Sequence, residues 1–296
     1  MNFVNSVLLA SVFIFMLEAC VSNNPHGEIK RIVVFGDSNV DSGNLYRLTN
    51  HQIPASPHWQ GRTCNGPLVT EYLAQSLEAR LENYAVAGAT TGETNIVATL
   101  MPVLKQIKAT GMRAQIAQFV QSGHQLGRTD LIVLWAGSND IFRIQRGEKT
   151  DLRQSIERAT NNLELAMARL YDLGGRNFIV ATRTPRTRLE TEENLNGRDL
   201  NQAIEQLIGR YPAREGLSVN TFDAYASISD MMRNPRHYGF SENVHDLCIE
   251  NPTCASERFE DGLPVADGYI NWDAAHKTTR VHRLLANQIG EMLTHQ

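Results

Sequence analysis

Residues 32–44 read I-V-V-F-G-D-S-N-V-D-S-G-N. Four apolar residues that favour β-structure, Ile32 to Phe35, run directly into the turn Gly36-Asp37-Ser38. A short apolar run that ends in a turn is typical of a buried strand in a parallel sheet. Ligands of open α/β sheets bind just beyond the carboxyl ends of such strands, so Ser38 is a candidate nucleophile. Taken alone, the stretch fits an ordinary strand-to-helix turn capped by Asp or Ser equally well.

Strands and helices alternate along the rest of the chain. Four further apolar runs predict strands at 83–86, 131–135, 178–181 and 217–222. Helical spacing of apolar residues predicts helices at 68–81, 113–123, 151–173, 195–211, 225–233 and 276–293. This alternation predicts the α/β class, with one parallel sheet of five strands and helices on both faces.

The composition is that of a globular protein of 296 residues, 42% of them hydrophobic. No linker separates a second domain, so we expect a single domain over residues 30–296. The net charge of −4 implies no general attraction to nucleic acid. Nothing in the composition indicates an obligate protein partner.

The N-terminal segment has the features of an export signal. Val7–Leu17 is an almost wholly apolar run, too short for a comfortable membrane span and suited to a signal-peptide core. We therefore predict a signal peptide over residues 1–20, a linker over 21–29, and an exported protein. Leu17-Glu18-Ala19-Cys20 resembles a bacterial lipobox, although Glu18 is unusual there and no Lys or Arg precedes the apolar run. Both lipidation of Cys20, which would anchor the protein to the outer membrane, and ordinary cleavage into the periplasm or medium stay open.

Two of the four cysteines, Cys248 and Cys254, lie close together in a polar stretch. In an exported protein this spacing favours a disulfide with a small loop. A metal site with His245 is the alternative, but no set of four zinc ligands is visible. Cys64 has no obvious partner.

Three of the predicted strands end in turns of small and polar residues: 36–38, 87–89 and 137–140. Because parallel strands bring their carboxyl ends to one edge of the sheet, these turns should meet in one crevice. At the expected start of the last helix, Asp273 and His276 are three residues apart and would share one side of a helical turn.

Acyl transfer requires a nucleophile, a base, a group that orients the base, and donors for the oxyanion. Ser38, His276 and Asp273 can fill the first three roles. The backbone N–H groups of Ser38 and Gly88 and the side-chain amide of Asn139 can supply the donors. Each residue also has an ordinary explanation as a helix cap, a packing glycine or a surface polar group, but coincidence of all of them is improbable.

These blocks resemble the GDSL (SGNH) hydrolases. F-G-D-S-N-V-D-S-G-N is similar to the first block of that family, N-Y-A-V-A-G-A to the second, G-S-N-D to the third and W-D-A-A-H to the last. The resemblance implies a flavodoxin-like three-layer α/β/α fold and serine ester hydrolysis without a metal or cofactor. Asn39 stands where the family name expects Leu. We expect Asp37 and Asp41 to support the turn around Ser38 and not to carry out the chemistry.

The spacing of the blocks and N-P-R-H-Y-G-F are similar to the branch of bacterial lysophospholipases and glycerophospholipid–cholesterol acyltransferases. This implies a lipid ester or lysophospholipid as substrate, acyl transfer as a second activity, and contact with a membrane surface. We also expect residues 240–268, tied by the disulfide, to form a flap over the acyl pocket; an inert surface insertion is the alternative. A carbohydrate or cell-wall O-acetylesterase is the main competing function, and a non-catalytic surface lipoprotein is the weakest.

Three arginines, Arg183, Arg186 and Arg188, follow the strand predicted at 178–181. An arginine cluster near the crevice can bind a phosphate through paired hydrogen bonds, as a phospholipid head group would require. A solvated loop with Glu190 and Glu192 nearby explains the same residues.

Overall fold

The computed structural model describes residues 28–97, 107–145, 151–241 and 243–294. The predicted signal peptide, including Cys20, and most of the predicted linker lie outside the described residues. Five strands form one sheet in which every pairing is parallel, in the order β2-β1-β3-β4-β5. The strands are β1 (Arg31–Gly36), β2 (Arg80–Asn83), β3 (Asp130–Trp135), β4 (Asn177–Ala181) and β5 (Ser218–Phe222).

This strand order is that of flavodoxin-like sheets. The chain passes from β1 to β2 on one side and then crosses to β3 on the other, so the direction of winding reverses between β1 and β3. A crevice opens beyond the carboxyl ends of the strands at such a reversal. The turns that follow β1 and β3 carry Ser38 and Asn139, which brings both residues to this crevice.

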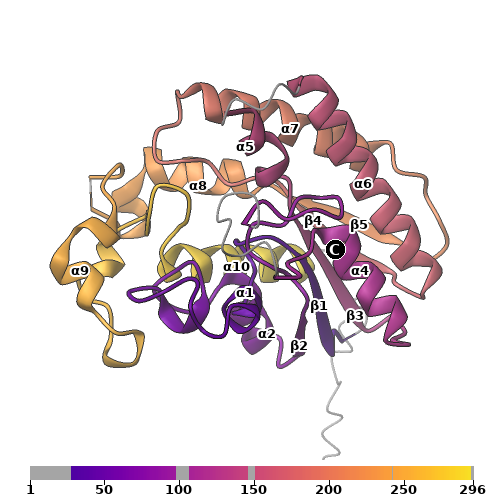
Figure 1. The fold of residues 1–296 in the computed structure, drawn as a ribbon, viewed down its shortest axis with the longest axis horizontal. Helices are drawn as coiled ribbons and strands as arrows, with labels where there is room; N and C mark the ends of the chain where they lie inside the picture. Colours follow the sequence, from indigo (N-terminus) through magenta and orange to yellow (C-terminus); the bar gives the residue numbers. More distant parts are fainter. Residues whose placement is uncertain (1–27, 98–106, 146–150, 242, 295–296) are drawn as a thin grey trace, which may run out of the picture.

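Helices cover both faces of the sheet, as Figure 1 shows. Alternate residues of β1 point to opposite faces: Ile32 and Val34 belong to one hydrophobic core, and Val33 and Phe35 to the other. The first core is closed by α2 (Val69–Ser76), α8 (Ala224–Arg233) and α10 (Thr279–Thr294). The second is closed by α4 (Met112–Gln121), α5 (Ser138–Gln145), α6 (Leu152–Asp172) and α7 (Glu192–Gly209). The predicted three-layer α/β/α fold is therefore confirmed.

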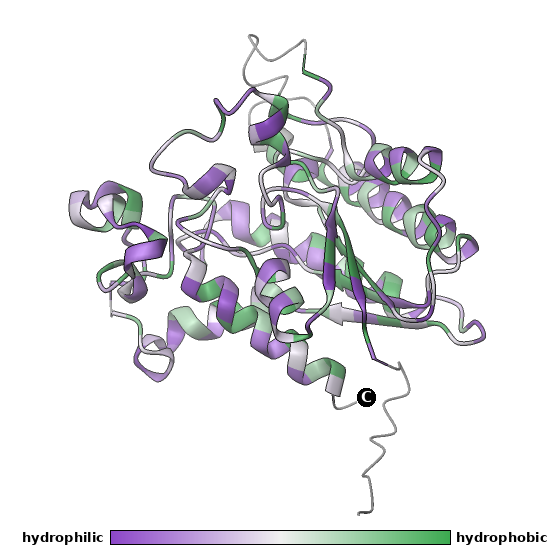
Figure 2. Cartoon of the chain, turned by 90° about the horizontal axis from the view of Figure 1, so that it is seen from below, coloured by the Kyte–Doolittle hydropathy of each residue, from purple (hydrophilic) through white to green (hydrophobic). Residues whose placement is uncertain are grey.

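The helices around the sheet carry both hydrophobic and hydrophilic residues, as amphipathic helices do (Figure 2). None of the helices that the structure describes is long and apolar enough to cross a membrane.

Several predicted boundaries are wrong. The helix expected at 68–81 ends at Ser76, and the strand expected at 83–86 lies at Arg80–Asn83. This strand, β2, lies at the edge of the sheet. It contains the charged residues Arg80 and Glu82, which form an ion pair (2.7 Å), and it therefore lacks the apolar run that is typical of a buried strand. The last helix begins at Thr279 and not at His276.

Shorter elements surround the carboxyl edge of the sheet. On the β1 side these are α1 (Asn44–Leu48) and the 3-10 turn η1 (Trp59–Gly61). Beyond α8, the chain leaves the sheet and forms a lobe with its own small core around the buried Cys248, Cys254 and Trp272. The short elements of this region are η3 (Pro235–Tyr238), η4 (Cys248–Glu250), α9 (Pro252–Ser256), η5 (Phe259–Asp261) and η6 (Ala266–Gly268).

Candidate active site

Gly36 ends β1 at a point where no side chain fits. A Cβ atom there would lie 2.2 Å from the carbonyl oxygen of Trp135 in β3. Gln115 of α4 holds the same peptide from the other side, since its Oε1 accepts from Gly36 N–H (2.9 Å) and its Nε2 donates to Gly36 O (3.0 Å). The chain is thereby fixed two residues before Ser38.

Two buried aspartates support the turn that carries Ser38. The Oδ1 atom of Asp37 accepts from the backbone N–H and the side-chain amide of Asn39, at 3.0 and 2.8 Å. Burial raises the pKa of Asp37 to about 6, although these hydrogen bonds and the nearby His276 and Arg186 act to lower it. The carboxylate of Asp41 accepts from the N–H groups of Gly43, Asn44, Leu45 and Ala87. As expected, both residues support the turn.

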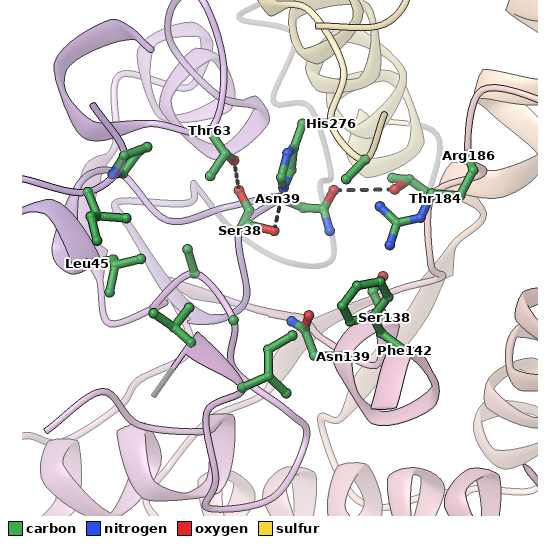
Figure 3. Close-up of a pocket in the computed structure, with 17 residues that line it drawn as sticks. Ser38, Asn39, Leu45, Thr63, Ser138, Asn139, Phe142, Thr184, Arg186 and His276 are labelled. Carbon is green, nitrogen blue, oxygen red and sulfur yellow. Dashed lines mark hydrogen bonds between the residues drawn. The ribbon is translucent and has the colours of Figure 1, made fainter. Parts of the chain in front are cut away.

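Ser38, His276 and Asp273 form one chain of hydrogen bonds (Figure 3 shows its first link). The Nε2 atom of His276 lies 2.9 Å from Ser38 Oγ, and its Nδ1 atom lies 2.8 Å from Asp273 Oδ2. Because a carboxylate only accepts, Nδ1 carries the proton and Nε2 is free to accept one from Ser38. The sequence therefore identified three residues that the fold brings together.

The turn from Asp273 to His276 is a tight loop before α10, not the first turn of a helix. Asp273 Oδ1 accepts from the N–H groups of Ala275 (2.7 Å) and His276 (2.8 Å). Burial would raise the pKa of Asp273, but the charge of His276 and the hydrogen bonds to it hold that pKa far below its usual range. Asp273 is thus an anion beside the imidazole.

The candidate oxyanion donors follow three neighbouring strands: Ser38 lies in the turn after β1, Gly88 in the loop after β2, and Asn139 in the first turn of α5 after β3. Gly88 has φ +86°, and a Cβ there would lie 2.5 Å from atoms of Asn95 and Val97. Asn139 donates one amide hydrogen to Ala89 O (2.9 Å), which fixes the amide in the cavity and leaves its second hydrogen available. Over the described ranges, no protein acceptor takes the N–H of Ser38 or of Gly88.

A cavity of about 270 Å³ opens at Ser38. Its two ends differ in chemistry: Leu45 and Arg186 lie on opposite sides of Ser38 in Figure 3. One end is polar, and there Thr184 donates to Asn39 Oδ1 (3.4 Å). The other end is apolar: there Leu45 packs with Ile53, Ala87 and Val97. The cavity is also lined by the apolar residues Pro54 and Ile96.

Of the three arginines, only Arg186 lines this cavity. Its Nε donates to Glu193, and its guanidinium lies 5.7 Å from the ring of Phe142. Arg183 is buried, donates to Asn194 (3.2 Å), shares the carboxylate of Glu193 (3.0 Å) with Arg186, and does not line the cavity. Arg188 is exposed and does not line the cavity.

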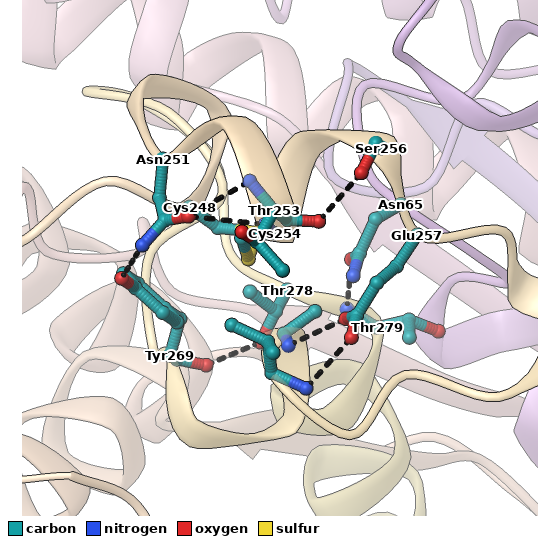
Figure 4. Close-up of a disulfide and its surroundings, with 12 residues drawn as sticks. Asn65, Cys248, Asn251, Thr253, Cys254, Ser256, Glu257, Tyr269, Thr278 and Thr279 are labelled. Atoms are coloured by element: carbon teal, nitrogen blue, oxygen red, sulfur yellow. Dashed lines mark hydrogen bonds between the residues drawn. A yellow bond between two sulfur atoms is a disulfide. The ribbon is translucent and has the colours of Figure 1, made fainter.

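Cys248 and Cys254 form a disulfide, as predicted (Figure 4). Cys64 is a buried free thiol. Among the residues of the lobe at 240–268 that the structure describes, none lines the cavity at Ser38, so the structure does not place this segment over the acyl pocket as expected. Instead, the N–H groups of Cys248 and Ile249 donate to the carbonyls of Asn271 and Trp272, both at 3.0 Å. The lobe therefore supports the strand-like segment that leads into Asp273.

Two residues important for the site were missed in the sequence. Gln115 falls on the apolar side of its helix, at helical spacing with Met112, Ile116 and Phe119, and a polar residue there is the signal that could have identified it. Asp140 accepts from the N–H (2.9 Å) and the hydroxyl (2.7 Å) of Thr91 and so ties the loop of Gly88 to α5. No spacing within the sequence predicts that contact.

Among the described residues, no group of three or more His, Cys, Asp or Glu side chains could hold a metal ion. A serine hydroxyl, an imidazole and a carboxylate joined by hydrogen bonds at the carboxyl edge of a 2-1-3-4-5 sheet are the features of a carboxylic ester hydrolase. The chain belongs to the GDSL-like lipase/acylhydrolase family, whose model matches residues 32–289.

The chain is similar in sequence to two bacterial proteins. It is 27% identical over 283 residues to the thermolabile hemolysin of Vibrio parahaemolyticus, covering 89% of this chain and 64% of that protein. It is 27% identical over 223 residues to the phosphatidylcholine-sterol acyltransferase of Aeromonas hydrophila, covering 72% and 63%. The chain thus spans less than two thirds of the length of either relative.

Among solved structures, the fold is similar to that of a lipolytic G-D-S-L family protein from Veillonella parvula. The TM-score is 0.52 at 16% identity, with 90% of this chain and 100% of that chain covered. The acetylxylan esterase Axe2 of Geobacillus stearothermophilus has the same TM-score at 13% identity, with 90% and 96% covered. Both comparisons support the three-layer fold.

Proposed function

We propose that this protein is an exported serine esterase of lipid esters that acts as a lysophospholipase A or phospholipase A. We further propose that it can transfer the acyl group to an alcohol. The observation that carries this proposal is the hydrogen-bonded chain Asp273–His276–Ser38 beside a cavity with one apolar end.

In this mechanism Ser38 Oγ attacks the ester carbonyl carbon while His276 Nε2 takes the hydroxyl proton. The carbonyl electron pair moves onto oxygen, and the N–H groups of Ser38 and Gly88 and the amide of Asn139 stabilise the oxyanion. When the carbonyl re-forms, the alcohol leaves with the proton from His276. A water molecule, or a second alcohol in acyl transfer, then attacks the acyl-Ser38 ester while His276 takes its proton. The bond between the acyl carbon and Ser38 Oγ breaks, His276 returns the proton to Oγ, and the fatty acid or new ester is released. Asp273 stabilises the imidazolium in both steps.

The apolar end of the cavity supports a long acyl chain as the group transferred to Ser38. Burying each methylene of such a chain is favourable by about 0.8 kcal/mol. An acetyl group would leave the apolar residues at this end of the cavity without a contact from the substrate, which argues against an O-acetylesterase. The names of the two relatives, a hemolysin and a phosphatidylcholine-sterol acyltransferase, are consistent with a lipid substrate.

Arg186 is the candidate for head-group recognition. Its guanidinium lies at the polar end of the cavity, across Ser38 from the acyl wall. A phosphate on the alcohol side of the ester would meet this charge. Contact of the cavity mouth with a membrane surface would deliver such a substrate.

We also propose that residues 30–296 form a single hydrolase domain behind a signal peptide (1–20) and a linker (21–29). The Cys248–Cys254 disulfide supports an oxidising compartment outside the cytoplasm. Cell fractionation of wild type and Cys20→Ala tests lipidation: loss of membrane association in the variant alone would establish it.

A panel assay on purified protein tests the activity, with lysophosphatidylcholine, diacylphosphatidylcholine, triacylglycerol and an acetylated sugar in parallel. We expect release of fatty acid from the phospholipids and no activity with Ser38→Ala. Activity on the acetylated sugar alone would establish the O-acetylesterase instead. Full activity of Ser38→Ala would overturn the mechanism.

Arg186→Ala tests the head-group assignment. We expect a loss of about tenfold or more in kcat/KM with lysophosphatidylcholine and a much smaller loss with monoacylglycerol, because only the first carries a phosphate. Arg188→Ala, which removes an exposed arginine from the same loop, is the matched control. Equal losses of Arg186→Ala on both substrates would count against phosphate binding.

A further inference from the structure

The carboxylate of Asp273 can accept one hydrogen bond in addition to those that it receives from His276 and from the backbone of its own turn. A carboxylate accepts at about four positions. Oδ1 takes the N–H groups of Ala275 and His276, and the Nδ1–H of His276 is shared between Oδ2 (2.8 Å) and Oδ1 (3.0 Å). The side of Oδ2 that these bonds leave open has a second imidazole near it: His58 Nε2 lies 3.8 Å away.

The orientation of His58 is fixed by two contacts. Its Nδ1 lies 2.9 Å from Ala55 O, and because a carbonyl only accepts, Nδ1 carries a hydrogen. Its ring packs edge-on against Trp272, with 5.8 Å between centroids and 79° between planes. The remaining nitrogen, Nε2, is therefore the atom presented to Asp273, and it can donate when the imidazole is protonated.

His58 does not line the cavity at Ser38. It lines a separate, polar cavity of about 350 Å³ between the 56–60 segment and the disulfide-bearing lobe, where Asn65 and Glu260 are among its neighbours. His58 and His276 thus approach the same oxygen of Asp273 from different cavities.

We propose that His58 is a positioning residue that holds the Asp273 carboxylate in the orientation that His276 requires. This inference rests on the proposed function, because it assumes that Asp273 orients His276 during catalysis. The side chain of Asp273 is 24% exposed, so rotation of its carboxylate is not prevented by burial alone. Two backbone N–H groups already hold Oδ1. Because misplacement of a catalytic group by about 1 Å can reduce the rate by about 10²-fold, a further contact at Oδ2 that limits this rotation would increase kcat.

Two substitutions distinguish the contribution of the Nε2 donor of His58 from that of its aromatic ring. His58→Phe keeps an aromatic ring against Trp272 and removes Nε2, and His58→Gln restores an N–H donor without the ring. With p-nitrophenyl butyrate we expect His58→Phe to reduce kcat about tenfold and to change KM less than about twofold. We expect His58→Gln to recover kcat to within about threefold of wild type. His237→Gln, at an exposed histidine, is the control for loss of an imidazole.

A double-mutant cycle decides whether the effect passes through Asp273. In an Asp273→Ala background, His58→Phe should cause no further loss of kcat, and the low-field proton resonance of His276 Nδ1–H should shift in His58→Phe alone. Unchanged kcat in His58→Phe, or equal losses with and without Asp273, would overturn the proposal. These outcomes are distinct from failure of the proposed function, which full activity of Ser38→Ala or Asp273→Ala would reveal.

Discussion

His276 Nε2 lies 2.9 Å from Ser38 Oγ, although the two residues are separated by 238 positions in the chain. Ser38 lies at the carboxyl edge of the sheet. The lobe around the disulfide supports the segment that positions His276 at the same edge.

Asp273→Asn should reduce kcat by about 10³–10⁴-fold with a much smaller change in KM. The Oδ1 atom of Asn can still accept from Ala275 and His276, but its NH₂ would face His276 Nδ1, which favours the wrong tautomer. Steady-state kinetics with p-nitrophenyl butyrate measure the loss, and thermal melts report the fold. Asp261→Asn, at an exposed aspartate, is the matched control. A loss below about tenfold would argue against the orienting role.

Asn139→Ala should reduce kcat by about 10²–10³-fold, because one donor to the oxyanion is lost. The substrate carbonyl before attack carries less charge, so KM should change little. The same substitution at the exposed Asn287 of α10 should leave kcat unchanged. If KM rises while kcat is retained, Asn139 binds the substrate and does not act on the transition state.

Ile53→Trp should shorten the acyl chain that the protein accepts. The larger side chain would fill the apolar end of the cavity, which Ile53 lines. We expect kcat/KM to fall about tenfold or more for p-nitrophenyl decanoate and less than about twofold for p-nitrophenyl acetate. Leu48→Trp is the control, since Leu48 is 41% exposed and does not line the cavity. A parallel loss on both esters would place the acyl chain elsewhere.

Replacement of both Cys248 and Cys254 by Ser should lower the free energy of unfolding by about 2 kcal/mol, as expected for a crosslink that closes a short loop. For a chain of this size that corresponds to a fall in Tm of about 4–8 °C. Activity should fall as well, because the N–H groups of Cys248 and Ile249 support Asn271 and Trp272 before Asp273. Calorimetry and kinetics on the same preparation test both effects. Full activity with a lowered Tm would show that the lobe stabilises the fold without aligning Asp273.

Stability should decrease as pH rises from about 4 to about 6, in part because of Asp37. Burial raises its pKa from 3.8 to about 6, so the folded state binds this proton more tightly than the unfolded state across that window. The free energy of unfolding then decreases through the window, by up to about 3 kcal/mol for this group, and is level above it. Asp37→Asn should remove this contribution, since Asn can still accept from Asn39.

Urea titrations at pH 4, 5, 6 and 7 measure the effect as the difference between wild type and Asp37→Asn. The variant should retain part of the slope from Asp140, whose burial raises its pKa to about 6 as well. That part should be smaller than in wild type, because the charge of Asp37 also acts to raise the pKa of Asp140. Identical slopes in the two proteins would show that Asp37 does not titrate in this range.

The buried strands and the functional residues that follow them were predictable from the sequence, but the edge strand β2 was not. Leu131–Trp135 is buried on both sides of the sheet, and its apolar run predicted β3 to within one residue. β2 carries arginine and glutamate because one side faces solvent, so its pattern resembles a helix surface and its position was missed. Ser38, Gly88 and Asn139 were found because parallel topology alone brings turns of this kind to one edge.

Contacts between loops were beyond prediction. The approach of His58 to Asp273 depends on how the 53–62 segment packs on the disulfide-bearing lobe, and neither has a periodic pattern. The three-residue spacing of Asp273 and His276 fits a helical turn and a tight loop equally well, so spacing alone does not predict the loop that precedes α10. The lobe itself was expected over the cavity, but its small apolar core around Trp272 holds it beside the sheet instead.

Asp41 has a consequence for protein engineering. Its single carboxylate accepts from the segment that begins α1 and from Ala87, next to Gly88, so it keeps the nucleophile turn and the oxyanion turn in register. A combinatorial library aimed at a new ester can therefore vary Ile53, Pro54 and Val97 on the cavity wall while Asp41 is kept constant. A substitution of Asp41 would displace both turns at once, and any screen for turnover would eliminate such a variant.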